Sequence, residues 1–183
     1  MDAVDAIIGR ASPSQLVAPG PSPGQMKKIL LAAASAPDHG LMRPWRFLVI
    51  EGDARDRFGQ VMADSLKRRE PASTADRLDA ERKKTLRAPT LLVTATAIQD
   101  NPKVPAIEQI VAVGAATQNA MIAAHALGLG ALWRTGPVVY DAIVKRSLGF
   151  AEADTIVGIL YIGSIGTPGK PREREIESVT RRW

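Results

Sequence analysis

The sequence has no cysteine and only two histidines. The absence of cysteine excludes a disulfide framework, thiolate metal sites and cysteine nucleophiles. Two histidines leave little material for a serine triad, and the Gly-x-Ser-x-Gly elbow is missing. Asp38-His39 with His125 is too small a ligand set for a metal site, and no Walker phosphate loop is present. The remaining possibility is chemistry that a bound cofactor carries out. A protein without enzymatic activity would lack the same catalytic motifs, so their absence does not prove a cofactor.

Residues 1–5 contain no basic stretch followed by an apolar one, so we expect no secretion signal. We therefore expect a cytoplasmic protein. A length of 183 residues, 45% of them apolar, fits one domain with its own core. We expect that domain over residues 1–166. Residues 167–183 form a tail rich in proline, glycine and charge, which either frays or packs on a partner chain.

The formal charge of +5 raises the question of nucleic-acid binding. The densest basic runs, Lys67-Arg68-Arg69 and Arg82-Lys83-Lys84, have acidic neighbours and no aromatic side chain between them to stack on bases. Solvated helical faces are the favoured interpretation, so neither nucleic acid nor a membrane surface is expected as a partner. A mildly basic protein would still attract an anionic dinucleotide or a flavin phosphate.

Hydrophobic periodicity predicts helices alternating irregularly with strands, which indicates an α+β or α/β fold. Residues 12–23 hold four prolines and are predicted to be a loop. The predicted helices cover residues 2–10, 23–34, 51–87 with a break near Pro71, 106–127 and 138–148, and the predicted strands cover 47–51, 90–97, 130–135 and 155–162.

Residues 106–127 are nearly uncharged, and alanine recurs every fourth residue from Ala112 to Ala124. Such a row makes a shallow ridge that lets another helix approach closely. A membrane span is the rival interpretation, but Gln118, Asn119 and His125 interrupt the apolar run. We favour a core helix that lies partly at a subunit interface.

Residues 36–47 are the most informative stretch, because two prolines, a histidine, two arginines and a tryptophan lie between a predicted helix and a predicted strand. Such a loop is a common place for a site, although a rigid turn explains the prolines as well. Trp45 and Phe47 are expected to anchor the loop in the core. Arg46 is expected to point away from them by strand alternation.

Three segments together resemble the nitroreductase family of FMN-dependent NAD(P)H oxidoreductases, especially its small compact members: Ile8-Gly9-Arg10-Ala11-Ser12, residues 36–47, and Gly130 to Gly136 (Gly-Ala-Leu-Trp-Arg-Thr-Gly). Val104-Pro105 with Glu108 adds a weaker match. The resemblance implies an α/β sandwich with a mixed, mostly antiparallel central sheet of about four strands flanked by helices. It also implies a homodimer with two flavins at the subunit interface.

The resemblance assigns Arg10, Ala11 and Ser12 to FMN, and an arginine with a hydroxyl is a donor set that suits its phosphate dianion. Without the resemblance, a helix-terminal arginine and a capping serine would explain this pair. Many family members carry further basic residues here, where this chain has Ala11 and then Pro13, Ser14 and Gln15. Weaker FMN binding or a lower redox potential is therefore expected.

The other two segments supply the remaining FMN contacts that the resemblance implies. From the partner subunit they are Ser35, Pro37, Asp38 and His39, and from the strand end they are Trp133, Arg134 and Thr135. His39 as a turn cap and Trp133 as a core residue stay open as alternatives. By family analogy the nicotinamide nucleotide lies near Ala123, Ala124, His125, Ala126, Leu127 and Gly128. Gly128-Leu129-Gly130 is not a Rossmann fingerprint, because the glycines precede the strand, and Gly128 suits a helix C-cap better.

The resemblance implies ping-pong transfer of hydride from NAD(P)H to FMN and then of electrons to a nitroaromatic, quinone or similar acceptor. It assigns no catalytic acid or base and no metal. Two alternatives stay open: a non-catalytic protein that stores, delivers or senses FMN, and an interaction domain without a cofactor. The first would keep the flavin contacts and lose turnover, whereas the second would bind no flavin.

Overall fold

The computed structural model describes residues 2–170 and 174–183. The described helices are α1 (Ala3–Gly9), α2 (Pro23–Ala34), α3 (Ala54–Arg69), α4 (Ala75–Arg82), α5 (Ala106–Ala126), α6 (Pro137–Tyr140) and α7 (Ala142–Ser147), with the 3-10 helices η1 (His39–Leu41), η2 (Lys83–Arg87) and η3 (Glu177–Val179). The described strands are β1 (Gln15–Val17), β2 (Trp45–Glu51), β3 (Thr90–Thr96), β4 (Gly130–Arg134) and β5 (Thr155–Thr167).

The strands form one sheet in which β3 lies between β2 and β5, while β1 and β4 both pair with β5. Every pairing among the described strands is antiparallel. The predicted antiparallel sheet flanked by helices is confirmed, but its expected mixed character is wrong. The fifth strand, β1, lies inside the predicted loop. Its single buried apolar residue, Leu16, pairs with Ile165, and one buried residue among prolines gives no detectable alternation.

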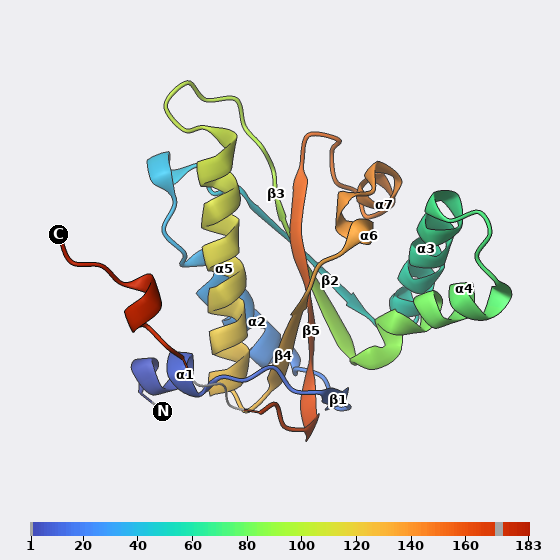
Figure 1. Cartoon of the computed structure of the whole chain (residues 1–183), viewed down its shortest axis with the longest axis horizontal. Coiled ribbons are helices and arrows are strands. Elements are labelled where there is room, and N and C mark those ends of the chain that lie inside the picture. Colours follow the sequence, from blue (N-terminus) through green and yellow to red (C-terminus); the bar gives the residue numbers. More distant parts are fainter. Residues whose placement is uncertain (1, 171–173) are drawn as a thin grey trace.

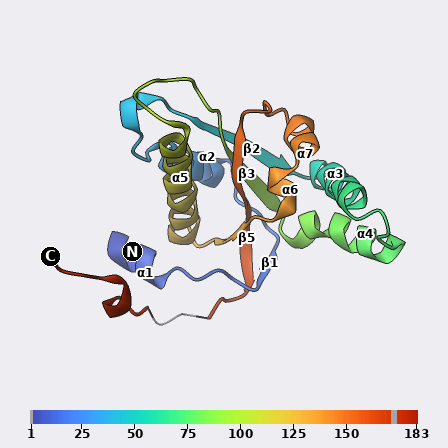
Figure 2. The same ribbon diagram turned by 45° about the horizontal axis from the view of Figure 1, so that its top comes forward.

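Helices cover both faces of this sheet (Figure 1). On one face α2 and α5 pack against Leu92, Leu160 and Ile162. On the other face α3, α6 and α7 pack against residues of the same strands, including Leu91 and Tyr161. The strand periodicity of two explains this division, because neighbouring residues of β3 and β5 enter opposite layers. Figure 2 shows α5 and α3 on opposite sides of the sheet from a second angle.

The alanine row of α5 faces α2 rather than solvent. Ala116, Ala120 and Ala124 are fully buried in one cluster with Ile29 and Ala33 of α2. The prediction that another helix approaches this ridge closely is confirmed, and that helix belongs to the same chain. Because an alanine side chain such as that of Ala116 ends at Cβ, it does not hold the backbones of α2 and α5 apart.

The start of α2 follows directly from its sequence. Ser22 accepts a hydrogen bond from the amide of Gln25, while the Gln25 side chain accepts one from the amide of Ser22. This is a complete capping box, and Pro23 occupies the first helical position, where its missing N–H costs nothing. The predicted bounds of this helix, residues 23–34, are confirmed.

Three other predictions of extent are wrong. The predicted helix 138–148 is two helices, because Asp141 leaves helical geometry and caps α7 through the amides of Ile143 and Val144. Strand β2 begins at Trp45, two residues before the predicted start. Strand β5 runs on to Thr167, past the predicted strand end at residue 162, because its last residues pair with β1. In the described part of the chain, no helix has the length and apolarity that crossing a bilayer requires.

Candidate functional site

A cavity of about 650 Å³ opens on the α3 side of the sheet. Leu132, Ile159 and Tyr161 line it from β4 and β5. Residues 13–16, which directly follow the segment 8–12, and residues 134–138 at the end of β4 form its walls together with α3, α4 and η2. Its size lies in the range of pockets that hold a cofactor or drug-sized ligand.

Positive charge dominates the lining of this cavity. The basic lining residues are Arg69, Arg77, Lys84, Arg87 and Arg134, and the acidic ones are Glu70 and Glu81. Both carboxylates are engaged by cations of the same wall, since Arg77 lies 2.7 Å from Glu70 and Lys84 lies 2.6 Å from Glu81. The remaining positive charge favours an anionic ligand.

Tyr161 lines this cavity, and its phenol is protonated. Burial raises the pKa of the Tyr161 phenol, and the positive charges of Arg134 and Arg87 offset only part of that rise. The phenol therefore keeps its hydrogen at neutral pH and can donate it.

Arg10 and Ser12 lie directly after α1. One terminal nitrogen of the Arg10 guanidinium, Nη1, donates to the Ser12 hydroxyl over 3.4 Å. The Arg10 Nε is buried and is among the few described side-chain atoms without a hydrogen-bond partner. A buried donor without a partner is costly, and a phosphate oxygen would satisfy it. The residues present thus fit the phosphate group of FMN.

The segment after β5 packs on this Arg10–Ser12 element. A Cβ at Gly169 would overlap the carbonyl of Ser12 and contact Ala11. The amide of Ser14 also donates to the carbonyl of Thr167 over 3.1 Å. The two chain segments therefore hold each other in place, although more than 150 residues separate them in the sequence.

Arg134 and Thr135 enter the cavity where β4 ends, and Gly136 turns the chain with a φ of +129°. Trp133 behaves differently. Its indole packs on the α5 side of the sheet and its Nε1 donates to the carbonyl of Val157 over 3.3 Å. Strand alternation places Leu132 and Arg134 on the cavity side. The Trp133 side chain thus occupies a core position, the alternative that the sequence left open, and its flavin contact stays a prediction.

The predicted partner-facing group lies at the other end of α5. His39 Nδ1 is 2.6 Å from Glu108 in the first turn of that helix. Asp38 accepts a hydrogen bond from the amide of Arg43, and the Ser35 hydroxyl donates to the carbonyl of Leu31. Pro37 and His39 are exposed. Figure 1 shows η1 beside the start of α5 and α1 beside its end.

Within one chain, the structure therefore does not bring residues 10–12 together with residues 35–39, the FMN contacts expected from the partner subunit. Helix α5 has 21 residues, which corresponds to a length of roughly 30 Å. The expected anchoring of the loop is observed, because Trp45 and Phe47 pack against the core layer that contains α2. Arg46 is exposed and donates to the carbonyl of Trp45, as strand alternation predicts.

The predicted nicotinamide segment, residues 123–128, is the C-terminal end of α5 and its cap. Ala124 is fully buried, and the carbonyl of Leu127 accepts a hydrogen bond from Gln25. Gly128 adopts a φ of +78° directly after the helix, which confirms its interpretation as a capping residue. The role of this segment towards a nicotinamide nucleotide stays a prediction.

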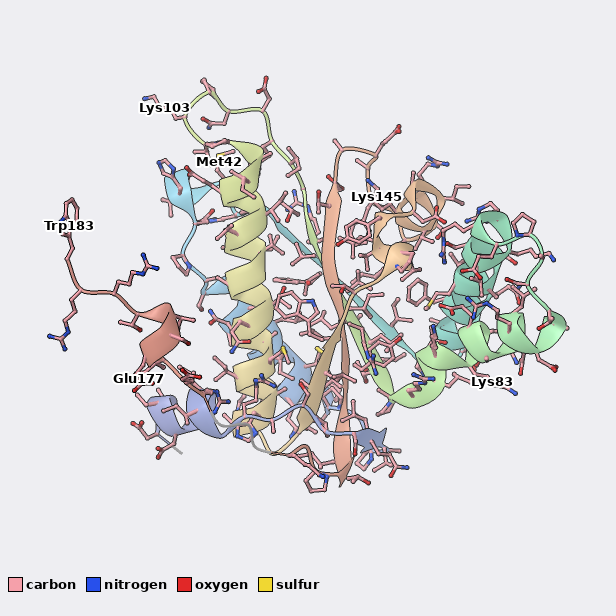
Figure 3. The ribbon with its side chains drawn as sticks, viewed as in Figure 1. Met42, Lys83, Lys103, Lys145, Glu177 and Trp183 are labelled. Carbon is pink, nitrogen blue, oxygen red and sulfur yellow. The ribbon has the colours of Figure 1, made fainter. Side chains whose placement is uncertain are left out.

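The sequence interpretation missed the basic wall of the cavity. The sequence pattern predicts a solvated face for the run Arg82-Lys83-Lys84, which holds for Lys83, since it points outward and pairs with Asp79 (Figure 3). Lys84, the next residue, lines the cavity. The available signal was helical spacing, because three successive residues spread over roughly 200° of a helix and do not share one narrow solvent face.

Comparison with known proteins agrees with this architecture. The profile of the Nitroreductase family matches residues 7–164. Two curated relatives carry the name "Putative NAD(P)H nitroreductase". YdjA of Escherichia coli K12 is 38% identical over 165 residues, which cover 90% of this chain and 88% of YdjA. The Haemophilus influenzae protein is 28% identical over 165 residues, covering 90% of this chain and 89% of its own.

Solved structures show the same fold. The nitroreductase-like family protein from Bacillus cereus superimposes with a TM-score of 0.88 at 22% identity, covering all of this chain and 96% of its own. The nitroreductase with bound FMN from Bacteroides fragilis gives 0.76 at 19% identity, covering both chains in full. From the match over residues 7–164 and the identity to YdjA, we conclude that this chain belongs to the nitroreductase family.

Proposed function

We propose that the protein is an FMN-dependent oxidoreductase that uses NAD(P)H to reduce nitroaromatic, quinone or similar acceptors. The observation that carries this proposal is one positively charged cavity lined by residues 13–16, which directly follow the family segment 8–12, and by residues 134–138, which overlap the family segment 130–136. The names of the curated relatives and the FMN bound in the Bacteroides fragilis structure support the choice of cofactor and hydride donor. The cytoplasmic location stays a prediction.

The chemistry that bound FMN supplies is acceptance of a hydride from NAD(P)H followed by delivery of electrons to a second substrate. The residues of this chain bind and orient the cofactor. Arg10 and Ser12 would hold the phosphate, because Arg10 has an unsatisfied buried donor beside a hydroxyl. Arg134 and Lys84 line the cavity and would place positive charge near the ring of FMN bound there, which would favour the negative charge of a reduced flavin.

No side chain is assigned as an obligatory acid or base. Tyr161 is a protonated donor within the cavity, and its raised pKa prevents it from acting as a base near neutral pH. Glu70 and Glu81 are held by Arg77 and Lys84. The site is thus built for binding and electrostatic tuning.

We propose further that the functional unit is a homodimer. The end of α1, which Arg10 follows, and η1, which contains His39, lie at opposite ends of α5, and a helix of roughly 30 Å is too long for both residues to reach one FMN from the same chain. One chain would supply Arg10 and its partner would supply His39. The outer face of α5 supports this arrangement, since Ile107 and Val111 are each 63% exposed at helical spacing.

The tail would pack on the partner chain. The described tail residues 174–183 extend away from the body of the molecule (Figure 3). They expose three large apolar side chains, Ile176, Val179 and Trp183. Burying these side chains on a second subunit would remove apolar area from water. Removal of residues 174–183 should then weaken the dimer, measured by light scattering across a dilution series.

One preparation tests the proposal against its alternative, an FMN-binding protein without turnover. The purified protein is mixed with FMN, separated from free flavin and treated with NADH or NADPH without oxygen. Bleaching of the flavin absorbance by either donor supports the oxidoreductase. Retained FMN that stays oxidised with both donors favours storage, delivery or sensing. A protein that retains no FMN overturns both, and a monomer that retains FMN overturns the shared site.

A further inference from the structure

The loop that carries His39 is fixed by two neighbouring residues of α5, Glu108 and Gln109. Glu108 reaches the imidazole directly, with 2.6 Å between its Oε2 and His39 Nδ1. Both side chains are accessible, 60% for His39 and 46% for Glu108. The pair therefore lies at the surface, where a second chain can meet it.

Gln109 secures the loop from the inner side. Gln109 is 1% exposed, and its side-chain amide bonds to both backbone groups of Gln99. The amide oxygen accepts from the Gln99 N–H over 3.0 Å, and the amide nitrogen donates to the Gln99 carbonyl over 2.8 Å. Its amide also donates to the Val104 carbonyl over 3.1 Å. The Gln99 side chain in turn donates to the carbonyl of Met42, directly after η1.

The chemistry of the pair decides which imidazole nitrogen is free. An ionised carboxylate only accepts hydrogen bonds, so the nitrogen that faces Glu108 must carry hydrogen. That nitrogen is Nδ1, and this holds for the neutral ring and for the imidazolium. Nε2 is then the only ring nitrogen left for a ligand, whereas the sequence left both available. The hydrogen bond made by one ring nitrogen commonly fixes the role of the other.

We propose that Glu108 is a positioning residue: its carboxylate holds the hydrogen on Nδ1 of His39 and so directs Nε2 at the FMN of the partner subunit. Gln109 is the support of this arrangement, because it ties the loop to the same turn of α5. The inference rests on the proposed function for the identity of the ligand. Which nitrogen of the His39 imidazole carries hydrogen depends on Glu108 of the same chain and does not require bound FMN.

The first measurement therefore uses protein without flavin. Long-range ¹H–¹⁵N spectra of histidine-labelled protein distinguish the two tautomers, and the chain has only two histidines to assign. His125→Gln serves only to identify the other ring. We expect hydrogen on Nδ1 of His39 in the unaltered protein and a shift towards Nε2–H in Glu108→Ala. An Nε2–H ring in the unaltered protein overturns the inference.

The second measurement is a double-mutant cycle on FMN affinity, read from quenching of flavin fluorescence. Glu108→Ala and His39→Ala should each raise the Kd about tenfold, as expected for one hydrogen bond involving a charged group. The double variant should bind no more weakly than His39→Ala, because Glu108 acts through His39. Glu108→Gln keeps an acceptor oxygen and should restore most of the affinity. Lys103→Ala, an exposed change near the same end of α5, is the control (Figure 3).

The outcomes separate this inference from the proposed function. If Glu108→Ala weakens FMN binding by the same factor with and without His39, Glu108 acts as a structural residue and the inference is wrong. If Glu108→Ala leaves the FMN affinity unchanged, the inference is wrong as well. Absence of FMN binding to the unaltered protein is a failure of the proposed function instead.

Discussion

The indole of Trp133 packs directly over Gly158, so that a side chain at Gly158 would overlap the ring. Trp133 lies in β4 and Gly158 in the neighbouring strand β5. The indole Nε1 donates to the carbonyl of Val157, which fixes the ring across the sheet. A glycine at this position is therefore a packing requirement, because it leaves room for the indole of the family-matched Trp133 on the α5 side of the sheet.

Replacing Gly158 by alanine should destabilise the fold by about 1–3 kcal/mol, since the added methyl group must displace Trp133 or its strand. The free energy of urea unfolding measures the loss. The control is Gly24→Ala, at an open position of α2 with no atom within 4 Å of the added Cβ. That change should be neutral or slightly stabilising, because alanine is the better helix former. Equal stability of the two variants would contradict the packing argument.

Arg10→Ala should raise the Kd for FMN by about 10–100-fold, the usual size of a hydrogen bond to a charged group. The reason is that Arg10 has a buried donor without a partner, placed beside Ser12. Fluorescence titration gives the Kd. Arg57→Ala, on an exposed position of α3, removes the same charge away from the site and should leave the Kd unchanged. An unaltered affinity in Arg10→Ala would remove this residue from the phosphate role.

Gly169→Ala should also weaken FMN binding, because a Cβ there overlaps the carbonyl of Ser12 and pushes the phosphate-binding segment away. We expect a clear loss of affinity with little loss of overall stability, since Gly169 lies after the last strand. The Kd and the urea midpoint are measured on the same preparation. An unchanged Kd would show that the segment yields without disturbing the site.

Lys84→Gln should lower the redox potential of bound FMN by about 30 mV, equivalent to ~1.4 kcal/mol for a two-electron couple. Lys84 lines the cavity, and its removal leaves Glu81 without its ion-pair partner. Both changes disfavour the negative charge of the reduced cofactor. Lys83→Gln is the matched control, since Lys83 points outward. Identical shifts in the two variants would assign the effect to net charge alone.

Asp141→Asn should make the fold less sensitive to acid. Partial burial would raise the pKa of Asp141, but hydrogen bonds from Ser65, the amides of Ile143 and Val144, and Arg68 together lower it below its usual value. A depressed pKa contributes stability above the unfolded-state value near 3.9, and this stability is lost as pH falls through the folded-state value. Urea unfolding between pH 6 and pH 3 should therefore show a steeper decline in the unaltered protein. Parallel declines would contradict this assignment.

The sequence by itself determined the elements whose signals are local. The capping box at Ser22 and Gln25 fixed the start of α2, and the glycine cap at Gly128 fixed the end of α5. The prediction that Arg10, Ser12 and Arg134 are site residues also comes from short family-matched segments. Each of these signals lies within a few residues, because helix caps and strand alternation depend on neighbouring backbone groups.

Only the tertiary structure decided which segments meet. It placed Lys84 in the wall of the cavity, turned Trp133 into the core and added β1 to the sheet. It also placed α1, which Arg10 follows, and η1, which contains His39, at opposite ends of α5. These relationships join residues that lie tens of residues apart or more, and packing of layers decides them. Local sequence patterns carry no information on which face of a distant element a side chain will meet.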